Sequence, residues 1–315
     1  MEPFVVTPKD IDLRRELMAA GWRDRDIARA VRCGDLSKVR YGAYIRTPLL
    51  TDLDDVGLAR VRSRAVLRTA TPSAVLSHHS GLAEYGLPLW GMDLDSTHVT
   101  RTDGRAGRRE AGVIQHRAVL EDGDWSVRDD VRVVTLARAV LEVIVTHRSE
   151  VGLVAACMAL TSGMATLEQL RAEEARTERW PNSLNVRIVL ARADHRLSNV
   201  AEARTWHCFH EQRLPLPEPQ VEVHDEFGNL LGIVDFLWRD RGVFLEFDGK
   251  LKYEKYRKPG ETLDQYLLRE KRREELICQV TGWVCIRIQW SDLESPVRTA
   301  KRIDQVLASR VKAKA

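Results

Sequence analysis

The sequence predicts a mixed α/β protein of two or three domains, from its length and from the order of its segments. The chain has 315 residues, and a typical domain has roughly 100–200. Two apolar runs rich in β-branched and aromatic residues flank the polar turn Arg239–Gly242, which is typical of a β-hairpin. Helix, three strands, helix, strand, helix over residues 183–315 is the order of an α/β sandwich around a central mixed sheet.

The composition is that of a globular protein, with 44% hydrophobic and 30% charged residues. Net charge is only +3, so any binding to nucleic acid must depend on where the basic residues lie. The five cysteines never form a CxxC pair, which indicates reduced cysteines rather than a zinc site or a disulfide framework. No apolar run reaches the roughly 18 residues of a membrane span, and MEPFVVTPKD does not resemble a signal peptide. We expect a cytoplasmic protein with no membrane partner.

Residues 1–50 have the outline of a winged helix-turn-helix. Residues 10–20 have helical spacing, a second helix is expected between Asp24 and Gly34, and residues 37–46 resemble a short hairpin. Basic residues of the second helix and the hairpin would contact DNA phosphates. The alternative is a small helical domain with a solvated basic surface. The candidate phosphate contacts are Arg25, Arg29, Arg32, Lys38 and Arg40.

Residues 51–182 are expected to form a middle α/β segment, and residues 183–315 the final domain. The pair His78 and His79 in the middle segment invites interpretation as a metal site. Adjacent histidines on a helix point to different faces, and no nearby cysteine or acid cluster completes a ligand set. The sequence therefore favours a structural role for both histidines.

The hairpin of the final domain carries acids inside apolar strands. With the turn centred between Asp240 and Arg241, Trp238 faces Val243 and Asp235 faces Glu246. Both faces of the hairpin are largely apolar, which predicts a sheet covered on both sides. Like charges that face each other in such a sheet repel, and a divalent cation is the simplest explanation for them. Oxygen ligands of this kind suit Mg²⁺.

Two resemblances to known families extend this reading. Glu202 on a helix, Asp235 on a strand and Glu246 on the next strand resemble the PD-(D/E)XK, restriction-endonuclease-like nucleases. Within them, GIVDFLW, VFLEFDGKLKY and LLREKRREELICQVTGWVCIRIQWSDL resemble uncharacterised domains related to very short patch repair (Vsr) endonucleases. The segments AVRCGDLSKVRYGAYI and AVLSHHSGLAEYGLPLW are similar to AbiEi-type antitoxins, whose winged helix binds promoter DNA.

The nuclease resemblance implies a Mg²⁺ or Mn²⁺ site held by Asp235 and Glu246, with Glu202 completing the ligand set. For Glu202 a structural role is equally open, because Asn199-x-x-Glu202 has the spacing of a helix capping box. The sequence departs from the family pattern at the lysine two residues after Glu246, where Asp248 stands instead.

Asp248 is a candidate further ligand, because residues two apart share a strand face. The replacement lysines to consider are Lys250, Lys252 and Lys271. Basic residues interleaved with tyrosines follow the acids, and this pattern favours a polyanionic partner. From this stretch, the candidate nucleic-acid contacts are Lys252, Tyr253 and Arg272.

These observations lead to three functional hypotheses. The first is a Mg²⁺- or Mn²⁺-dependent DNA endonuclease that its winged helix positions on double-stranded DNA. The second is an antitoxin-type transcriptional regulator with an inactive nuclease-like domain, and the third is an RNA-directed nuclease. A setting in toxin-antitoxin or phage-defence systems, or in repair, is implied by the resemblances alone. A homodimer is left open.

Overall fold

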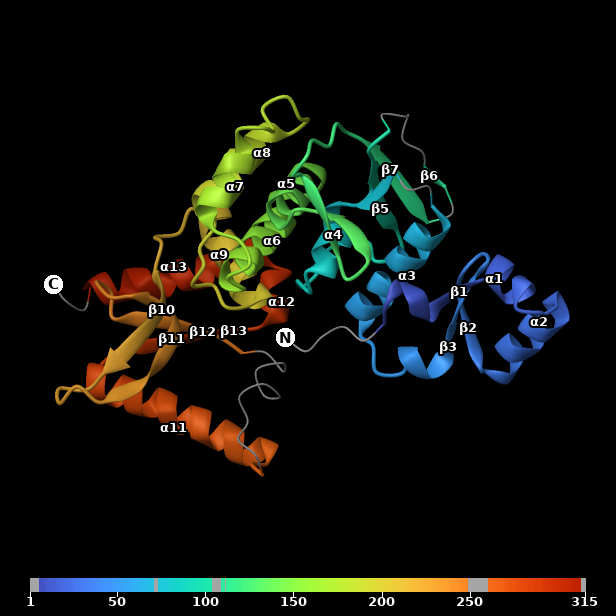
Figure 1. Ribbon diagram of the computed structural model, residues 1–315. Coiled ribbons are helices and arrows are strands. Elements are labelled where there is room, and N and C mark those ends of the chain that lie inside the picture. Colours follow the sequence, from blue (N-terminus) through green and yellow to red (C-terminus); the bar gives the residue numbers. More distant parts are fainter. Residues whose placement is uncertain (1–5, 71–72, 104–108, 111, 249–259, 313–315) are drawn as a thin grey trace. The chain divides into compact units, whose positions relative to one another are not determined.

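The computed structural model describes residues 6–70, 73–103, 109–110, 112–248 and 260–312. It confirms the mixed α/β class and divides the chain into two compact units, Met1–Ala193 and Asp194–Ala315 (Figure 1). The segments predicted as residues 1–50 and 51–182 both belong to the first unit. The helix at Ser183–Arg192, which we expected in the final domain, also lies there, because the Asn185 side chain donates a 2.9 Å hydrogen bond to the Ile144 carbonyl.

The first unit begins with a small three-stranded sheet and two helices. Its elements are η1 (Pro8–Asp10), β1 (Ile11–Leu13), α1 (Arg14–Ala19), α2 (Asp24–Cys33), β2 (Leu36–Arg40), β3 (Ala43–Arg46) and η2 (Thr47–Leu50). The predicted pair of helices and the hairpin are confirmed, with Gly34 ending α2 in the left-handed conformation at φ 82°. The first helix starts later than residue 10 because Ile11 pairs with Ile45, which makes β1 the third strand of the β1-β3-β2 sheet.

The rest of the first unit is built on a six-stranded mixed sheet. Its elements are α3 (Asp55–Thr69), β4 (Ala74–Leu76), α4 (His78–Glu84), β5 (Thr97–Arg101), β6 (Arg109–Glu110), β7 (Val113–Arg117), β8 (Trp125–Arg128), β9 (Val131–Val134), α5 (Leu136–Thr146), α6 (Ser149–Thr161), α7 (Leu167–Glu174) and α8 (Ser183–Arg192). The strand order is β6-β7-β5-β4-β9-β8, with β5 parallel to β7 and β4 parallel to β9. Most of α5 and α6 is buried, so these two helices form the centre of the unit.

The second unit is a four-stranded sheet with helices on both faces. Its elements are α9 (Val200–Glu211), β10 (Glu218–His224), β11 (Leu230–Trp238), β12 (Val243–Phe247), α11 (Leu263–Thr281), β13 (Val284–Ile288), α12 (Trp290–Leu293) and α13 (Pro296–Lys312). The order is β10-β11-β12-β13, antiparallel except for the parallel pair β12 and β13. Figure 1 shows α11 on one face of this sheet and α9 and α13 on the other.

Apolar side chains explain how each face is covered. On one face, Phe209 of α9 stacks edge to face on Phe236 at 5.1 Å and on Trp238 at 5.3 Å between ring centroids. On the other, Ile277 of α11 belongs to a buried cluster with Leu237 and Phe244. Strand residues alternate between faces, so β11 and β12 serve both helix layers. The predicted sheet covered on both sides is confirmed.

The hairpin register agrees with the sequence. Trp238 pairs with Val243 as predicted, and the recorded pairing continues to Phe236 and Leu245. Gly242 in the turn has φ 60°, a conformation that glycine adopts without strain. In this register, Asp235 and Glu246 directly follow the last pair, Phe236 and Leu245.

None of the helices in the described parts of the chain combines the length and the hydropathy that a membrane crossing needs.

Candidate active site

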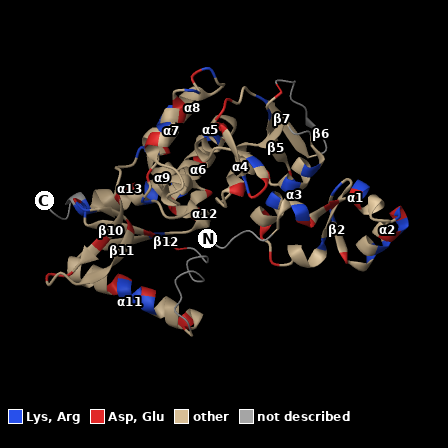
Figure 2. Ribbon diagram, viewed as in Figure 1, with Lys and Arg blue, Asp and Glu red and all other residues tan. Residues whose placement is uncertain are grey.

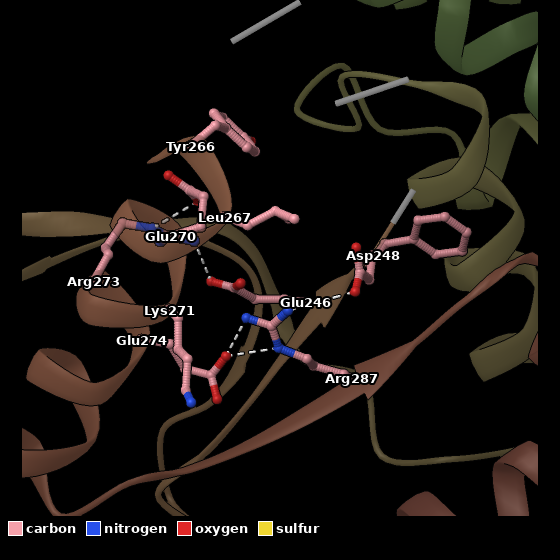
Figure 3. Close-up of a pocket in the computed structure, with 10 residues that line it drawn as sticks. Glu246, Asp248, Tyr266, Leu267, Glu270, Lys271, Arg273, Glu274 and Arg287 are labelled. Carbon is pink, nitrogen blue, oxygen red and sulfur yellow. Dashed lines mark hydrogen bonds and ion pairs between the residues drawn. The ribbon is translucent and has the colours of Figure 1, made fainter. Parts of the chain in front are cut away.

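A cleft of about 320 Å³ opens beside the end of β12 in the second unit. Two of its walls are strand residues, from β12 and β13, and the third is one face of α11 (Figure 3). The lining combines four carboxylates with three basic side chains. These charged residues are Glu246, Asp248, Glu270, Glu274, Lys271, Arg273 and Arg287.

Arg273 is the main partner of Glu246. Its Nη2 lies 2.7 Å from Glu246 Oε1, its Nε donates to Glu270 at 3.1 Å, and its Nη1 donates to the Ile233 carbonyl at 3.1 Å. A Cβ atom at Gly232 would lie 2.9 Å from Arg273 Nη1, so a larger residue there would push the guanidinium away from its present position. Burial alone would lower the pKa of Arg273, but Glu246 and Glu270 outweigh burial and raise it.

Arg287 takes the corresponding place beside Asp248. It stands opposite Glu246 in the parallel pairing of β12 and β13. Its Nη1 lies 3.5 Å from Asp248 Oδ2, and its Nε donates to Glu274 at 2.6 Å. Burial would lower the pKa of Arg287, but the hydrogen bond to Glu274 and the negative charges of Glu274 and Glu246 together outweigh burial and raise it. Two arginines from neighbouring elements thus supply positive charge close to the acids.

Asp235 is buried and closes the hairpin ladder with its side chain. Its Oδ2 accepts a 2.7 Å hydrogen bond from the Phe247 amide. We expected Asp235 to face Glu246, and the recorded strand pairing stops one step before that pair, at Phe236 and Leu245. A buried carboxylate needs hydrogen-bond donors, and the amide of β12 is one of them.

Glu202 has the contacts of a helix cap. Its carboxylate accepts the Ser198 amide at 2.7 Å and the Gln220 side chain at 3.0 Å, while Asn199 Oδ1 accepts the Glu202 amide at 3.0 Å. The capping role that the sequence left open is therefore present, with the backbone amide of Ser198 and the side-chain amide of Asn199 as donors to the carboxylate. Among the described residues, Glu202, Asp235 and Glu246 do not form a group of three whose ligand atoms all lie within 4.8 Å.

The candidate lysines differ in what the structure says of them. Lys271 lines the cleft, with its side chain 72% exposed and its Nζ 3.9 Å from Glu275. Arg272, the next residue of α11, is exposed. The remaining candidates of this stretch, Lys250, Lys252 and Tyr253, lie outside the described residues.

The basic face of α2 is the second candidate surface. Arg25, Arg29 and Arg32 are exposed and lie four and three residues apart, so they share one side of the helix, opposite the buried Ile27 and Ala30. Figure 2 shows the basic residues along α2 in blue. Within the described parts of the chain, these three arginines form no ion pair. On the hairpin, Lys38 is exposed and Arg40 is half-buried.

The acids of α2 do not cancel its basic face. Asp24 is held by Arg14 at 2.6 Å, and Asp26 lies 3.7 Å from Arg23. Both acids stand in the first turn of the helix. The positive charge of the later turns therefore faces solvent.

A histidine group in the first unit was not expected from the sequence. We expected His78 to lack nearby ligand partners, but His98 of β5 and His116 of β7 lie beside it, and so does the carboxylate of Glu142. Burial and the neighbouring imidazoles lower the pKa of His78, and burial lowers that of His116 to about 4. No sequence pattern connects these histidines, because β5 and β7 become neighbours only in the folded sheet.

No protein-family model matches the chain, and comparison with curated proteins finds no match.

Arg273→Gln tests whether the contacts of the Arg273 guanidinium stabilise the second unit. We expect a loss of about 1.5–3 kcal/mol in the free energy of unfolding, because the half-buried guanidinium gives up charged hydrogen bonds to Glu246 and Glu270. Urea denaturation measures the loss. Arg272→Gln is the matched control on the same helix and should change stability by less than about 0.5 kcal/mol. Equal effects of the two substitutions would contradict the assigned role.

Proposed function

We propose that the protein is a cytoplasmic, Mg²⁺- or Mn²⁺-dependent phosphodiesterase that acts on double-stranded DNA. The observation that carries this proposal is the cleft at the end of β12, where Glu246 and Asp248 meet the basic side chains Lys271, Arg273 and Arg287. Carboxylates beside cations in an open cleft suit a phosphate bound through a divalent metal. The resemblance to PD-(D/E)XK nucleases supports the same chemistry.

The residues present fit a hard divalent cation. Asp235, Glu246 and Asp248 offer only oxygen, and Mg²⁺ is commonly held by one or two carboxylates together with water and substrate phosphate. A preformed group of three carboxylates is therefore not required. When bound, Mg²⁺ polarises a phosphoryl oxygen and makes a bound water more acidic.

The basic side chains complete the proposed site. Lysine is absent from its usual place, at Asp248, and Arg287 reaches that carboxylate from the neighbouring strand. In the proposed site, Arg287 and the exposed Lys271 would bind phosphate oxygens and stabilise the charge that develops on them. Arg273 positions Glu246 by fixing one of its oxygens.

DNA binding is proposed for the first unit. The strand, two helices and hairpin from β1 to β3 have the order of a winged helix, and the exposed arginines of α2 would lie against phosphates. Such contacts position a protein on duplex DNA without specifying its sequence.

A second candidate function is a DNA-binding regulator of the antitoxin type with an inactive nuclease-like unit. The observation that favours it is that both proposed metal ligands in the cleft pair with arginine: Glu246 with Arg273 at 2.7 Å and Asp248 with Arg287 at 3.5 Å. A metal ion must compete with these cations. The two functions share the DNA-binding surface and differ in whether the cleft hydrolyses phosphodiesters.

Cleavage assays separate the two functions. Purified full-length protein is incubated with plasmid DNA and with structured RNA, each with Mg²⁺, Mn²⁺ or EDTA. We expect metal-dependent cleavage of DNA that Asp235→Asn and Glu246→Gln each reduce by at least about 100-fold, because each substitution removes a ligand charge. Glu222→Gln, an exposed carboxylate on β10, is the control and should cleave like the wild type.

Three outcomes would count against the proposal. Cleavage that neither substitution changes would contradict the assigned site. Binding of duplex DNA without any cleavage would favour the regulator. Cleavage of RNA alone would replace DNA as the substrate.

The DNA-binding surface has its own test. We expect Arg25→Ala combined with Arg29→Ala to weaken duplex binding and to lower the slope of log affinity against log salt by about 2, because each phosphate contact contributes roughly 0.9 to that slope. Fluorescence anisotropy at several salt concentrations measures both quantities. Arg187→Ala removes an exposed arginine from α8 of the same unit and should leave the slope unchanged. An unchanged slope in the double variant would exclude α2 as the phosphate-binding face.

A further inference from the structure

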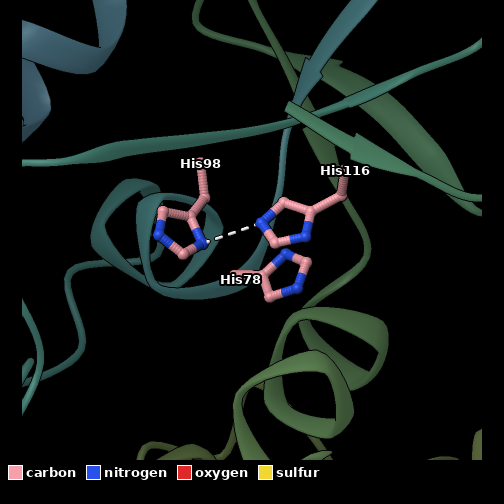
Figure 4. Close-up of side chains that lie close together, drawn as sticks. All are labelled: His78, His98 and His116. Carbon is pink, nitrogen blue, oxygen red and sulfur yellow. Dashed lines mark hydrogen bonds between the residues drawn. The ribbon is translucent and has the colours of Figure 1, made fainter. Parts of the chain in front are cut away.

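Three histidines converge inside the first unit, far along the chain from one another. His78 starts α4, His98 lies in β5 and His116 lies in β7 (Figure 4). One ring nitrogen from each lies within 4.8 Å of the other two. His78 and His98 are only 5% and 8% exposed and His116 is half-buried, so most of this group is covered by protein.

The rings contact one another directly. His116 Nε2 and His98 Nδ1 are 3.0 Å apart, and the rings of His78 and His116 are stacked with their centroids 3.7 Å apart. One proton can bridge one pair of ring nitrogens, but it cannot serve three rings. The group therefore concentrates nitrogen lone pairs in a small buried volume.

In His78 and His98, one ring nitrogen lies beside polar groups from outside the cluster. His78 Nδ1 lies 3.1 Å from Ser77 Oγ and 3.4 Å from Glu142 Oε2, and His98 Nε2 lies 3.4 Å from Ser96 Oγ. Metal-binding histidines commonly have such a partner on the nitrogen that does not bind the metal. A shared ligand would then take Nε2 of His78 and Nδ1 of His98, the nitrogen that faces His116 Nε2 at 3.0 Å.

The backbone at His78 is held in an unusual conformation. Its φ of 52° lies in the left-handed region, where a residue other than glycine costs about 1–3 kcal/mol. Glu142 stabilises the conformation by accepting the His78 amide at 2.9 Å, and Arg138 in turn donates to Glu142 at 3.1 Å. These contacts fix where the His78 ring leaves the backbone.

We propose that His78, His98 and His116 bind a divalent transition-metal ion, with Zn²⁺ as the physiological candidate. Neutral imidazoles suit Zn²⁺ and its neighbours in the first transition row, whereas Mg²⁺ prefers oxygen. Zn–N bonds of about 2.0–2.1 Å place tetrahedral ligand nitrogens roughly 3.3 Å apart, close to the 3.0 Å separation of His98 and His116. Because lone pairs lie in the ring plane, the His78 ring turns out of its stack with His116 when the ion binds.

Three protein ligands leave a fourth position on a tetrahedral ion. Thr100, directly opposite His116 in the pairing of β5 and β7, buries a hydroxyl that has no hydrogen-bond partner among the described residues. Thr100 shares its strand face with His98, because residues two apart point the same way. A water on the ion would give this hydroxyl a partner.

The test uses the full-length protein without a histidine tag, stripped of metal and titrated with Co²⁺ as a visible substitute for Zn²⁺. We expect one Co²⁺ per chain, a four-coordinate ligand-field spectrum without a thiolate charge-transfer band, and displacement of Co²⁺ by Zn²⁺. His98→Ala and His116→Ala should each weaken binding at least about 10-fold. His147→Ala, which changes a histidine of the same unit outside the group, is the matched control and should bind like the wild type.

The wild-type titration keeps the proposal falsifiable if a variant does not fold. Absence of stoichiometric Co²⁺ binding by the wild type would overturn the proposal, as would a thiolate band that cysteine alkylation removes. Circular dichroism of metal-free variants checks their folding. Folded variants that bind Co²⁺ as tightly as the wild type would equally overturn it.

Discussion

The geometry of the cleft depends on the hydrogen bonds and ion pairs that the Arg273 guanidinium makes. This guanidinium joins three elements at once, through Glu270 on its own helix α11, the Ile233 carbonyl of β11 and Glu246 of β12. Gly232 provides the space that this side chain needs against β11. The ion pair makes burial of Glu246 tolerable, because an unpaired carboxylate at that position would be costly to desolvate. Together with the packing of Ile277 in the buried cluster, this contact holds α11, and with it Lys271 and Glu274, against the sheet.

This arrangement explains how one cleft can support two functions. Arginine pairs with Glu246 and with Asp248, and a divalent cation with a phosphate would compete for the same oxygens. The proposed hydrolysis requires the carboxylates to exchange partners, whereas a regulator would keep them as they are. The basic face of α2 would serve either proposed function, because phosphate contacts need only exposed positive charge.

Local patterns in the sequence predicted much of the fold. The symmetry of the two apolar runs fixed the register at Trp238 and Val243, and Gly34 marked the end of α2. The predicted start of the first helix, at residue 10, was too early. Residues 11–13 form a strand instead, because they pair with β3, which follows later in the chain. The spacing of Asn199 and Glu202 is compatible with a helix cap and with a metal ligand. The structure adds a hydrogen bond from the Gln220 side chain to the Glu202 carboxylate, which this spacing does not predict.

The contacts that define the two candidate metal sites are non-local, and sequence spacing does not contain them. Arg287 reaches Asp248 only because β13 lies parallel to β12, and His98 reaches His116 only because β5 lies parallel to β7. The central claim concerns the cleft, and Mn²⁺ binding followed by electron paramagnetic resonance tests it most directly. The wild type should bind Mn²⁺, and Glu246→Gln should weaken that binding at least about 10-fold. Equal Mn²⁺ affinity in the two proteins would contradict the claim.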